Sequence, residues 1–225
     1  MSQAKTNKVL LVDEHPLFVR GLASLVGNMQ DYAVIGETNN LEDAVKTAEK
    51  EKPSLAIVEI NLSKGCGLDL LSVFKSRYPD MVILVLSMCD ERRYSERVLR
   101  LGARGYIMKD KPAEKVAEAI QTVMAGKLYL SEPERERLFE TATGEIRDEK
   151  DRAMAARRLS NREFQIFSCL GRGLGTIEIA SKYNLSTKTI DTHKEHIKLK
   201  LRCNSSQELR RLAIEWVHHP GMENP

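Results

Sequence analysis

The sequence lacks a segment that is long and apolar enough to cross a membrane. Its longest apolar runs, such as residues 81–86, are far shorter than the roughly 20 residues that a spanning helix needs. The first residues also lack the apolar core of a signal peptide. We therefore expect a cytoplasmic protein with no membrane partner.

Cysteine is scarce, and its spacing excludes the common cysteine-based sites. The 225 residues contain four cysteines, none of them in a C-x-x-C pair, so neither a zinc site nor a dithiol redox centre is predicted. Four of the five histidines lie in the last third of the chain, without Asp, Glu or Cys partners at the spacing of metal ligands. We expect free thiols and no histidine metal site.

A glycine-rich loop for a phosphate group is also missing. The segment 61–67 has neither a G-x-G-x-x-G pattern nor the lysine of a P-loop. The absence of both motifs argues against a flavodoxin-like enzyme that holds a cofactor. We predict that the chain is not an enzyme.

The length and the charge distribution indicate two domains. At 25.5 kDa the chain exceeds the common size of a single domain. Residues 1–150 hold 22 Lys and Arg against 24 Asp and Glu, a net charge of −2, whereas residues 151–225 hold 13 against 8, a net charge of +5. A small basic segment of this kind is typical of a module that contacts nucleic acid.

The first 127 residues alternate short apolar runs with longer amphipathic segments. The runs are continuous and rich in Val, Ile and Leu, as in strands that are buried on both faces; they span 9–12, 33–36, 55–58, 82–86 and 105–108. The segments between them have the apolar spacing of helices with one buried stripe and span 17–26, 41–49, 68–74, 94–101 and 116–124. Five such units predict an α/β domain over residues 1–127, with a five-stranded, doubly wound parallel sheet.

Residues 128–156 are predicted to be a linker that is partly helical. The apolar spacing is lost here, and charged residues dominate 145–152. These charges belong either to a solvated helix surface or to a flexible tether. Pro133 lies early in the segment, where a helix tolerates proline, so we predict a tether with a short helix.

Residues 157–225 carry the start signals of four helices. Ser160 and Glu163 form a capping box, in which the two side chains satisfy otherwise unpaired backbone N–H groups. The following helices have capping candidates in Thr176, Ser186 and Ser205. The helix after Ser186 is basic and polar on one side. Joined by a tight turn to the helix before it, it predicts a helix-turn-helix within an all-α, four-helix domain.

Polar residues follow four of the five predicted strands, at the edge of the sheet where ligands bind in parallel folds. They are Asp13 and Glu14, then Glu59, Ser87 and Lys109. We predict that Asp13, Glu14 and Glu59 form a cluster of oxygen ligands that binds Mg²⁺ weakly, with Lys109 as the counter-charge. The alternative is that strands simply end at the surface, which explains each residue singly better than all of them together.

Several of these segments resemble a family of bacterial regulators. Residues 11–16 (LVDEHP), the acid after the third strand, residues 86–87 and residues 102–109 (GARGYIMK) resemble the receiver domain of a response regulator. Residues 159–163, 178–180 and 185–193 (LSTKTIDTH) resemble the LuxR-type DNA-binding domain. Together they resemble the NarL/FixJ subfamily. This resemblance implies a flavodoxin-like sheet and a transcription regulator that binds double-stranded DNA as a symmetric homodimer.

The resemblance also implies that a histidine kinase transfers a phosphoryl group to an aspartate after the third strand, and that Ser87, Tyr106 and Lys109 serve as switch residues. This chain has Glu59 at the acceptor position. One extra methylene moves the carboxylate by more than about 1 Å, which is enough to lose the geometry of attack. We predict that ordinary phosphorylation is lost. Glu59 then either imitates the phosphorylated state weakly or pairs with Lys109 without further effect.

The predicted recognition helix has two distinct faces. Ile190, His193 and Ile197 are three and four residues apart and form the inward face, so His193 is expected to pack or to bond nearby backbone. The opposite face offers cations for phosphates and short polar groups for base edges: Lys188, Thr189, Asp191, Thr192, Lys194, Glu195 and Lys198. Because carboxylates repel phosphates, the two acids either accept from a cytosine amino group or orient neighbouring lysines.

The last helix carries more apolar surface than a small helical domain needs to bury. We predict that Leu209, Leu212 and Trp216 contribute to the homodimer. The leading hypothesis is a DNA-binding transcriptional response regulator whose receiver controls dimerisation or DNA access without ordinary phosphorylation. The alternative is a pseudo-receiver that acts mainly as a protein-interaction module.

Overall fold

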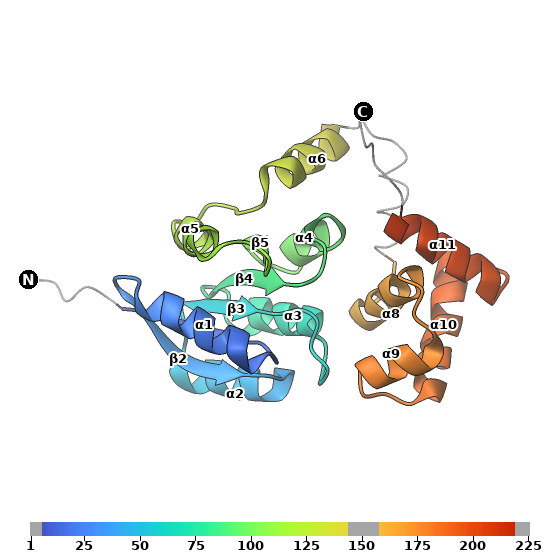
Figure 1. The fold of residues 1–225 in the computed structure, drawn as a ribbon, viewed down its shortest axis with the longest axis horizontal. Coiled ribbons are helices and arrows are strands. Elements are labelled where there is room, and N and C mark those ends of the chain that lie inside the picture. The colour runs from blue at the N-terminus through green and yellow to red at the C-terminus, as the bar shows by residue number, and fades with distance from the viewer. Residues whose placement is uncertain (1–5, 144–157, 219–225) are drawn as a thin grey trace, which may run out of the picture. The chain divides into compact units, whose positions relative to one another are not determined.

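The computed structural model describes residues 6–143 and 158–218, which belong to two compact units, Met1–Phe139 and Glu140–Pro225. In the first unit, a five-stranded parallel sheet carries helices on both faces (Figure 1), which confirms the predicted fold class. The strands are β1 (Asn7–Val12), β2 (Tyr32–Thr38), β3 (Leu55–Val58), β4 (Val82–Ser87) and β5 (Gly105–Met108). The helices that connect them are α1 (Pro16–Gly27), α2 (Leu41–Glu51), α3 (Gly67–Arg77), α4 (Glu91–Arg100) and α5 (Ala113–Met124).

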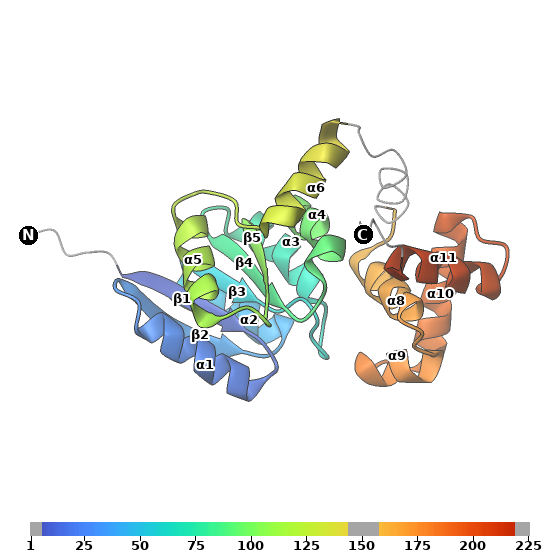
Figure 2. The same ribbon diagram turned by 45° about the horizontal axis from the view of Figure 1, so that its top comes forward.

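The strand order β2-β1-β3-β4-β5 decides where a site can form. The chain reverses its direction of winding between β1 and β3, and such a switch point opens a crevice at the carboxyl ends of the strands. Val12 pairs with Val58, so the residues that follow these two strands lie side by side. Helices α1 and α5 pack on one face of the sheet (Figure 2), where their Val, Leu and Ala residues form a buried core with the strands.

The two edges of the sheet differ. β2 departs from the prediction of a strand buried on both faces, because none of its residues is fully buried; it is an edge strand with one neighbour. β5 lies at the other edge, yet Gly105, Tyr106 and Ile107 are buried. The backbone of Tyr129 covers that edge, since its carbonyl accepts from the Tyr106 N–H (2.9 Å) and its N–H donates to the Arg104 carbonyl (3.1 Å).

Helix α6 (Glu132–Thr143) begins inside the segment predicted to be a linker, and its first turns pack on α4 (Figure 2). Glu134 is 4% exposed. It accepts hydrogen bonds from the Ser95 hydroxyl and from Arg137 Nη2 (2.6 Å), and Arg137 also donates to the Arg92 carbonyl (3.3 Å). The start of the linker is therefore fixed to the first unit. The charged run 145–152 lies outside the described residues.

The second unit is helical, as predicted, with α8 (Asn161–Gly171), α9 (Thr176–Lys182), α10 (Thr187–Leu201) and α11 (Ser206–His218). The capping box is confirmed: Ser160 Oγ accepts from the Glu163 N–H (3.3 Å), and Glu163 Oε2 accepts from the Ser160 N–H (2.7 Å). Ser186 Oγ likewise accepts from the Thr189 N–H (3.0 Å). These bonds fix the starts of α8 and α10.

The prediction that Thr176 caps α9 is wrong. Gly175 is the N-cap residue, and Glu178 Oε2 accepts from its N–H (2.7 Å). Thr176 is thus the first residue of the helix rather than its cap, and its hydroxyl contacts Asp191 and Lys194 of α10 instead. The four cysteines, Cys66, Cys89, Cys169 and Cys203, are free thiols as predicted.

Candidate functional site

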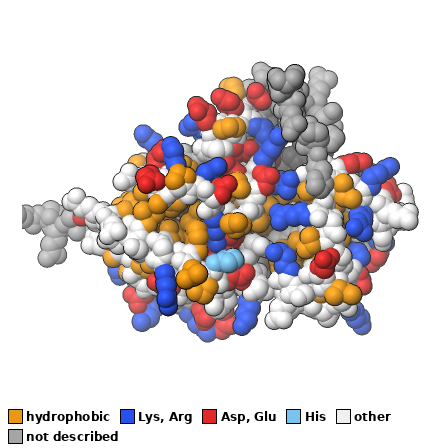
Figure 3. Space-filling view, viewed as in Figure 1, with side chains coloured by type: hydrophobic (Ala, Val, Ile, Leu, Met, Phe, Trp, Pro, Cys, Tyr) orange, Lys and Arg blue, Asp and Glu red, His pale blue; other side chains and the backbone are white. Residues whose placement is uncertain are grey.

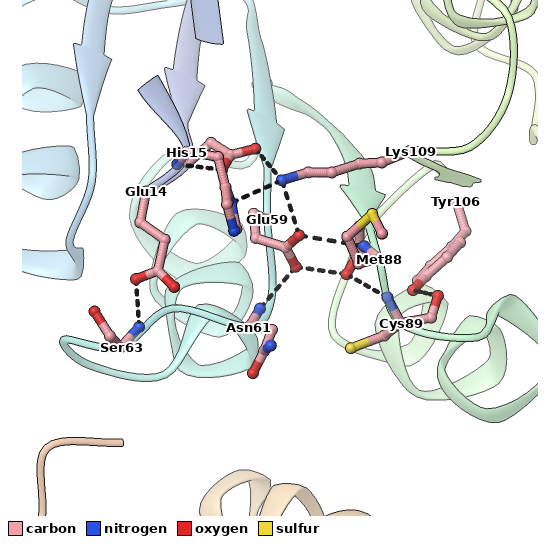
Figure 4. A network of polar contacts seen from close by, with 11 residues as sticks. Glu14, His15, Glu59, Asn61, Ser63, Met88, Cys89, Tyr106 and Lys109 are labelled. Atoms are coloured by element: carbon pink, nitrogen blue, oxygen red, sulfur yellow. Dashed lines mark hydrogen bonds and ion pairs between the residues drawn. The ribbon is translucent and has the colours of Figure 1, made fainter. Parts of the chain in front are cut away.

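Glu59 lies at the centre of a buried polar network at the carboxyl ends of the strands (Figure 4), where its side chain is 1% exposed. Oε1 accepts from Ser87 Oγ (2.5 Å) and from the Asn61 N–H (2.8 Å). Oε2 accepts from the Met88 N–H (3.3 Å) and pairs with Lys109 Nζ (3.1 Å). Each oxygen of the carboxylate thus has two partners within the protein.

Lys109 bridges this carboxylate to a second one. Its ammonium group also forms an ion pair with Asp13 Oδ2, and the side chains of Lys109 and Asp13 are only 3% and 5% exposed. The other oxygen of Asp13 accepts from the backbone N–H of His15 (3.0 Å), whose ring Nδ1 lies 2.8 Å away. Lys109 therefore neutralises the carboxylates that follow β1 and β3. Its removal would leave buried charges without a partner, which is costly.

Glu14 is directed elsewhere. Its Oε2 accepts from the Ser63 N–H (2.7 Å) and so anchors the loop after β3 (Figure 4). Among the residues that the structure describes, no group of three or more His, Cys, Asp or Glu side chains is arranged to hold a metal ion. Asp13 and Glu59 meet across the Lys109 ammonium rather than across a space for a cation. These residues do not fit a tightly held Mg²⁺ ion.

A chain of hydrogen bonds runs from Glu59 to Tyr106. Ser87 Oγ, which donates to Glu59, accepts from the Cys89 N–H (3.1 Å), and the Cys89 carbonyl accepts from the Tyr106 hydroxyl (2.7 Å). The Tyr106 side chain points inward and is 0% exposed. Burial raises the pKa of its phenol well above the ordinary value, so Tyr106 stays a neutral donor. The carboxylate and the aromatic ring are therefore connected through two residues.

Helix α10 presents the predicted inward and outward faces. Ile190 and Ile197 are fully buried, and His193 is half-buried, with burial lowering its pKa. Lys200 Nζ donates to Glu163 Oε2 of α8 (2.6 Å). Burial by itself raises the pKa of this carboxyl, but the bonds from Lys200 and Ser160 outweigh it and the pKa is lowered. An ion pair thus fixes how α10 lies against α8.

On the outward face, acids and lysines are paired. Lys194 Nζ lies 3.2 Å from Asp191 Oδ1 and donates to Thr176 Oγ1 of α9 (3.1 Å). Lys198 Nζ lies 2.8 Å from Glu195 Oε2. In the free protein, each of the two acids is therefore paired with a lysine of the same helix.

The other candidates of this face are Lys188 and Thr192, which are exposed, and Thr189, which is half-buried. Thr192 Oγ1 donates to the Lys188 carbonyl (3.0 Å). On the side of the second unit that Figure 3 shows, basic and acidic side chains are interspersed rather than separated.

The three dimer candidates of α11 lie at different depths. Leu209 is 1% exposed and belongs to the core of the unit, so its side chain is not available to a partner. Leu212 and Trp216 are half-buried, and the indole packs against Phe164 and Phe167 with ring centroids 5.2 and 5.7 Å apart.

Residues 9–121 match the model of the response regulator receiver domain, and residues 157–213 match that of the bacterial regulatory proteins of the luxR family. The chain is 32% identical over 212 residues to the oxygen regulatory protein NreC of Staphylococcus carnosus, with 92% of this chain and 97% of the relative covered. It belongs to the NarL-type response regulators. NreC of Staphylococcus epidermidis is 29% identical over 214 residues, with the same coverage.

Solved response regulators share the fold. The structure of RcsB from Salmonella enterica serovar Typhimurium bound to promoter rprA is 22% identical, with a TM-score of 0.61, and covers 93% of this chain and 98% of that one. A second RcsB structure has a TM-score of 0.64 at 22% identity and covers 94% and 98%. The family consists of DNA-binding transcription regulators rather than enzymes, as predicted. Within the described ranges, no helix of this response regulator is long and apolar enough to span a membrane.

Some of the groups that bind Glu59 in this response regulator cannot be recognised from the sequence. The N–H groups of Asn61 and Met88 bind Glu59 through the backbone, which any residue provides. The exposed Ile214 (39%) on α11 was also missed; its position three residues before Val217 suggests a core residue, and only the packing shows that it faces outward.

Proposed function

We propose that this response regulator binds double-stranded DNA as a homodimer through α10 and does so without prior phosphorylation. The receiver unit then controls dimerisation or access to DNA. The observation that carries the proposal is the Glu59 carboxylate, which is bonded to Ser87 and connected to the buried Tyr106. One solved RcsB structure contains two dimers bound to two parallel DNAs, and we propose a similar dimeric assembly for this protein.

The surroundings of Glu59 argue against phosphorylation by a histidine kinase. A nucleophilic carboxylate needs an accessible lone pair in line with the incoming phosphorus. Both oxygens of Glu59 already accept hydrogen bonds or pair with Lys109, and the side chain is 1% exposed. A phosphoryl donor would have to break these contacts first.

The same contacts favour the imitation of the phosphorylated state over a mere pairing with Lys109. Glu59 reaches past Lys109 and accepts from Ser87 at 2.5 Å, which is the contact expected of a phosphoryl oxygen. A carboxylate carries less charge and fewer acceptor oxygens than a phosphoryl group. We therefore propose a weak, permanent form of activation.

The proposed dimer contact is on α11. Leu212 and Trp216 retain exposed surface, and Ile214 is 39% exposed. Leu209 is left out of this contact because it is buried in the unit. Dimeric regulators place their two reading helices one helical turn of DNA apart, so paired half-sites are the expected target.

The unmodified full-length protein is expected to bind mixed-sequence duplex DNA at micromolar concentration, with an affinity that falls as salt rises. In a double variant, Lys194→Ala with Lys198→Ala, the slope of log K against log salt should decrease by about one unit for each lost phosphate contact. Fluorescence anisotropy over a salt series measures both quantities.

The control for this experiment is Lys46→Ala, since Lys46 is an acid-paired lysine on α2. It should leave the slope unchanged. Binding that persists in full after Lys194 and Lys198 are both removed would show that α10 is not the reading helix. A wild-type protein that binds no DNA at any salt concentration would favour the alternative, a pseudo-receiver that acts mainly as a protein-interaction module.

Mg²⁺ is expected to bind weakly at Asp13 and Glu59. Lys109 pairs with both carboxylates, and Glu14 is held by the backbone of Ser63, so few oxygen ligands are available. Calorimetric titration of Mg²⁺ into the protein should give little heat. Lys109→Ala should increase the affinity, because it leaves two carboxylates without their cation, and Asp13→Asn in that background should abolish the gain. Equal binding in all three proteins would place the ion elsewhere.

A further inference from the structure

Asp191 and Glu195 extend outward from α10, whereas the lysines paired with them are folded back. The acidic side chains are 59% and 62% exposed, and those of Lys194 and Lys198 are 21% and 19% exposed. A duplex that approaches this face of the helix therefore meets the two carboxylates before it meets these two ammonium groups.

These acids contribute little to the fold. Neither caps a helix. Within the described residues, the contact of Asp191 with another element is a 3.4 Å hydrogen bond from Thr176, and the partner that the structure gives Glu195 is Lys198 of the same helix. Exposed ion pairs of this kind add little stability, which leaves the two carboxylates available for recognition.

The chemistry of a carboxylate limits what it can recognise. An ionised carboxylate only accepts hydrogen bonds, and phosphates repel it. In the major groove, guanine presents two acceptors, and thymine presents an acceptor and a methyl group. Adenine places an acceptor beside its amino donor. Cytosine presents the amino group as its hydrogen-bonding feature, so it is the base edge that fits a carboxylate.

The spacing of the two acids along α10 sets which bases they can reach. Residues four apart lie on one face of a helix, about 6 Å apart along its axis. The rise between bases along one DNA strand is about 3.4 Å. Asp191 and Glu195 therefore reach bases about two positions apart.

We propose that Asp191 and Glu195 determine sequence specificity by accepting hydrogen bonds from the amino groups of two cytosines in each half-site. The proposal rests on the use of α10 for DNA binding. The same charges disfavour duplexes that lack these cytosines, because the carboxylates then face other acceptors. In the free protein, Lys194 and Lys198 hold the two carboxylates in position. When the complex forms, the lysines leave the carboxylates and bind DNA phosphates instead.

Selection from a pool of randomised duplexes tests the proposal, with the full-length wild type, Asp191→Asn and Glu195→Gln. The wild type should enrich C·G pairs at two positions of each half-site. Each variant should lose that preference at one position and gain A·T there, because an amide bonds the amino group and the N7 of adenine together. Replacing one selected C·G pair should weaken wild-type binding roughly ten-fold and the matching variant little.

The matched control is Glu42→Gln, which removes the same charge from a lysine-paired carboxylate on α2, 77% exposed. It should select the same sequences as the wild type. Recovery of DNA without a cytosine preference, or with a preference that neither α10 variant changes, overturns the specificity proposal alone. A wild type that recovers no DNA overturns the proposed DNA binding as well.

Discussion

Glu59→Asp is expected to convert a protein that accepts no phosphoryl group into one that does. The shorter side chain withdraws the carboxylate from Ser87 by more than about 1 Å, which frees an oxygen for attack. Asp13, Ser87 and Lys109 already surround the position. Intact-protein mass spectrometry after incubation with acetyl phosphate and magnesium chloride should show one phosphoryl group on the variant and none on the wild type.

Glu59→Gln is the control, since it keeps the length of the side chain and removes its charge. The Gln variant should remain unmodified. That result would show that phosphorylation of the Asp variant depends on its shorter carboxylate and not merely on a disturbed pocket. A base-labile phosphoryl adduct on Glu59 of the wild type would contradict the prediction. So would an aspartate variant that is folded, with an unchanged melting temperature, and still takes up no phosphoryl group.

The strands could be predicted because continuous apolar runs mark them. The strand-end residues could be predicted because the carboxyl ends of parallel strands lie at the same edge of a sheet. Continuous apolar runs located all five strands, and the parallel arrangement implied that Asp13, Glu59 and Lys109 converge. The edge position of β2 could not be read from its run of Ala33 to Gly36, since strand order is set by tertiary packing. The same limit applies to α6, whose charged residues look solvated until Glu134 is seen buried against α4.

The details of the pocket were less accessible to sequence reasoning. Asp13 and Glu14 are adjacent and chemically alike, and the direction of each depends on the loop after β3, where the Ser63 N–H binds Glu14. The cap of α9 differs by one residue from the expectation because Glu178 reaches back to Gly175. In both cases a backbone N–H group decides the outcome, and backbone donors are the same at nearly every residue.

Gly171→Ala is expected to cause the largest loss of stability in the second unit. A β-carbon at this position would lie 2.2 Å from the Ala213 carbonyl oxygen and 2.3 Å from Val217 Cγ2. The carbonyl belongs to the backbone of α11 and cannot rotate away, so α8 and α11 must separate, at a cost of about 3 kcal/mol or more. Gly21→Ala is the matched control, because nothing lies within 4 Å of its β-carbon and alanine is the better helix former.

Trp216 provides a selective measurement of this effect. It is the only tryptophan of the chain, and it packs on Phe164 and Phe167 between the same two helices. Urea unfolding followed by its fluorescence therefore reports on the second unit. The midpoint should fall strongly in Gly171→Ala and stay unchanged in Gly21→Ala. An unchanged midpoint in Gly171→Ala would show that α8 and α11 are not packed this closely.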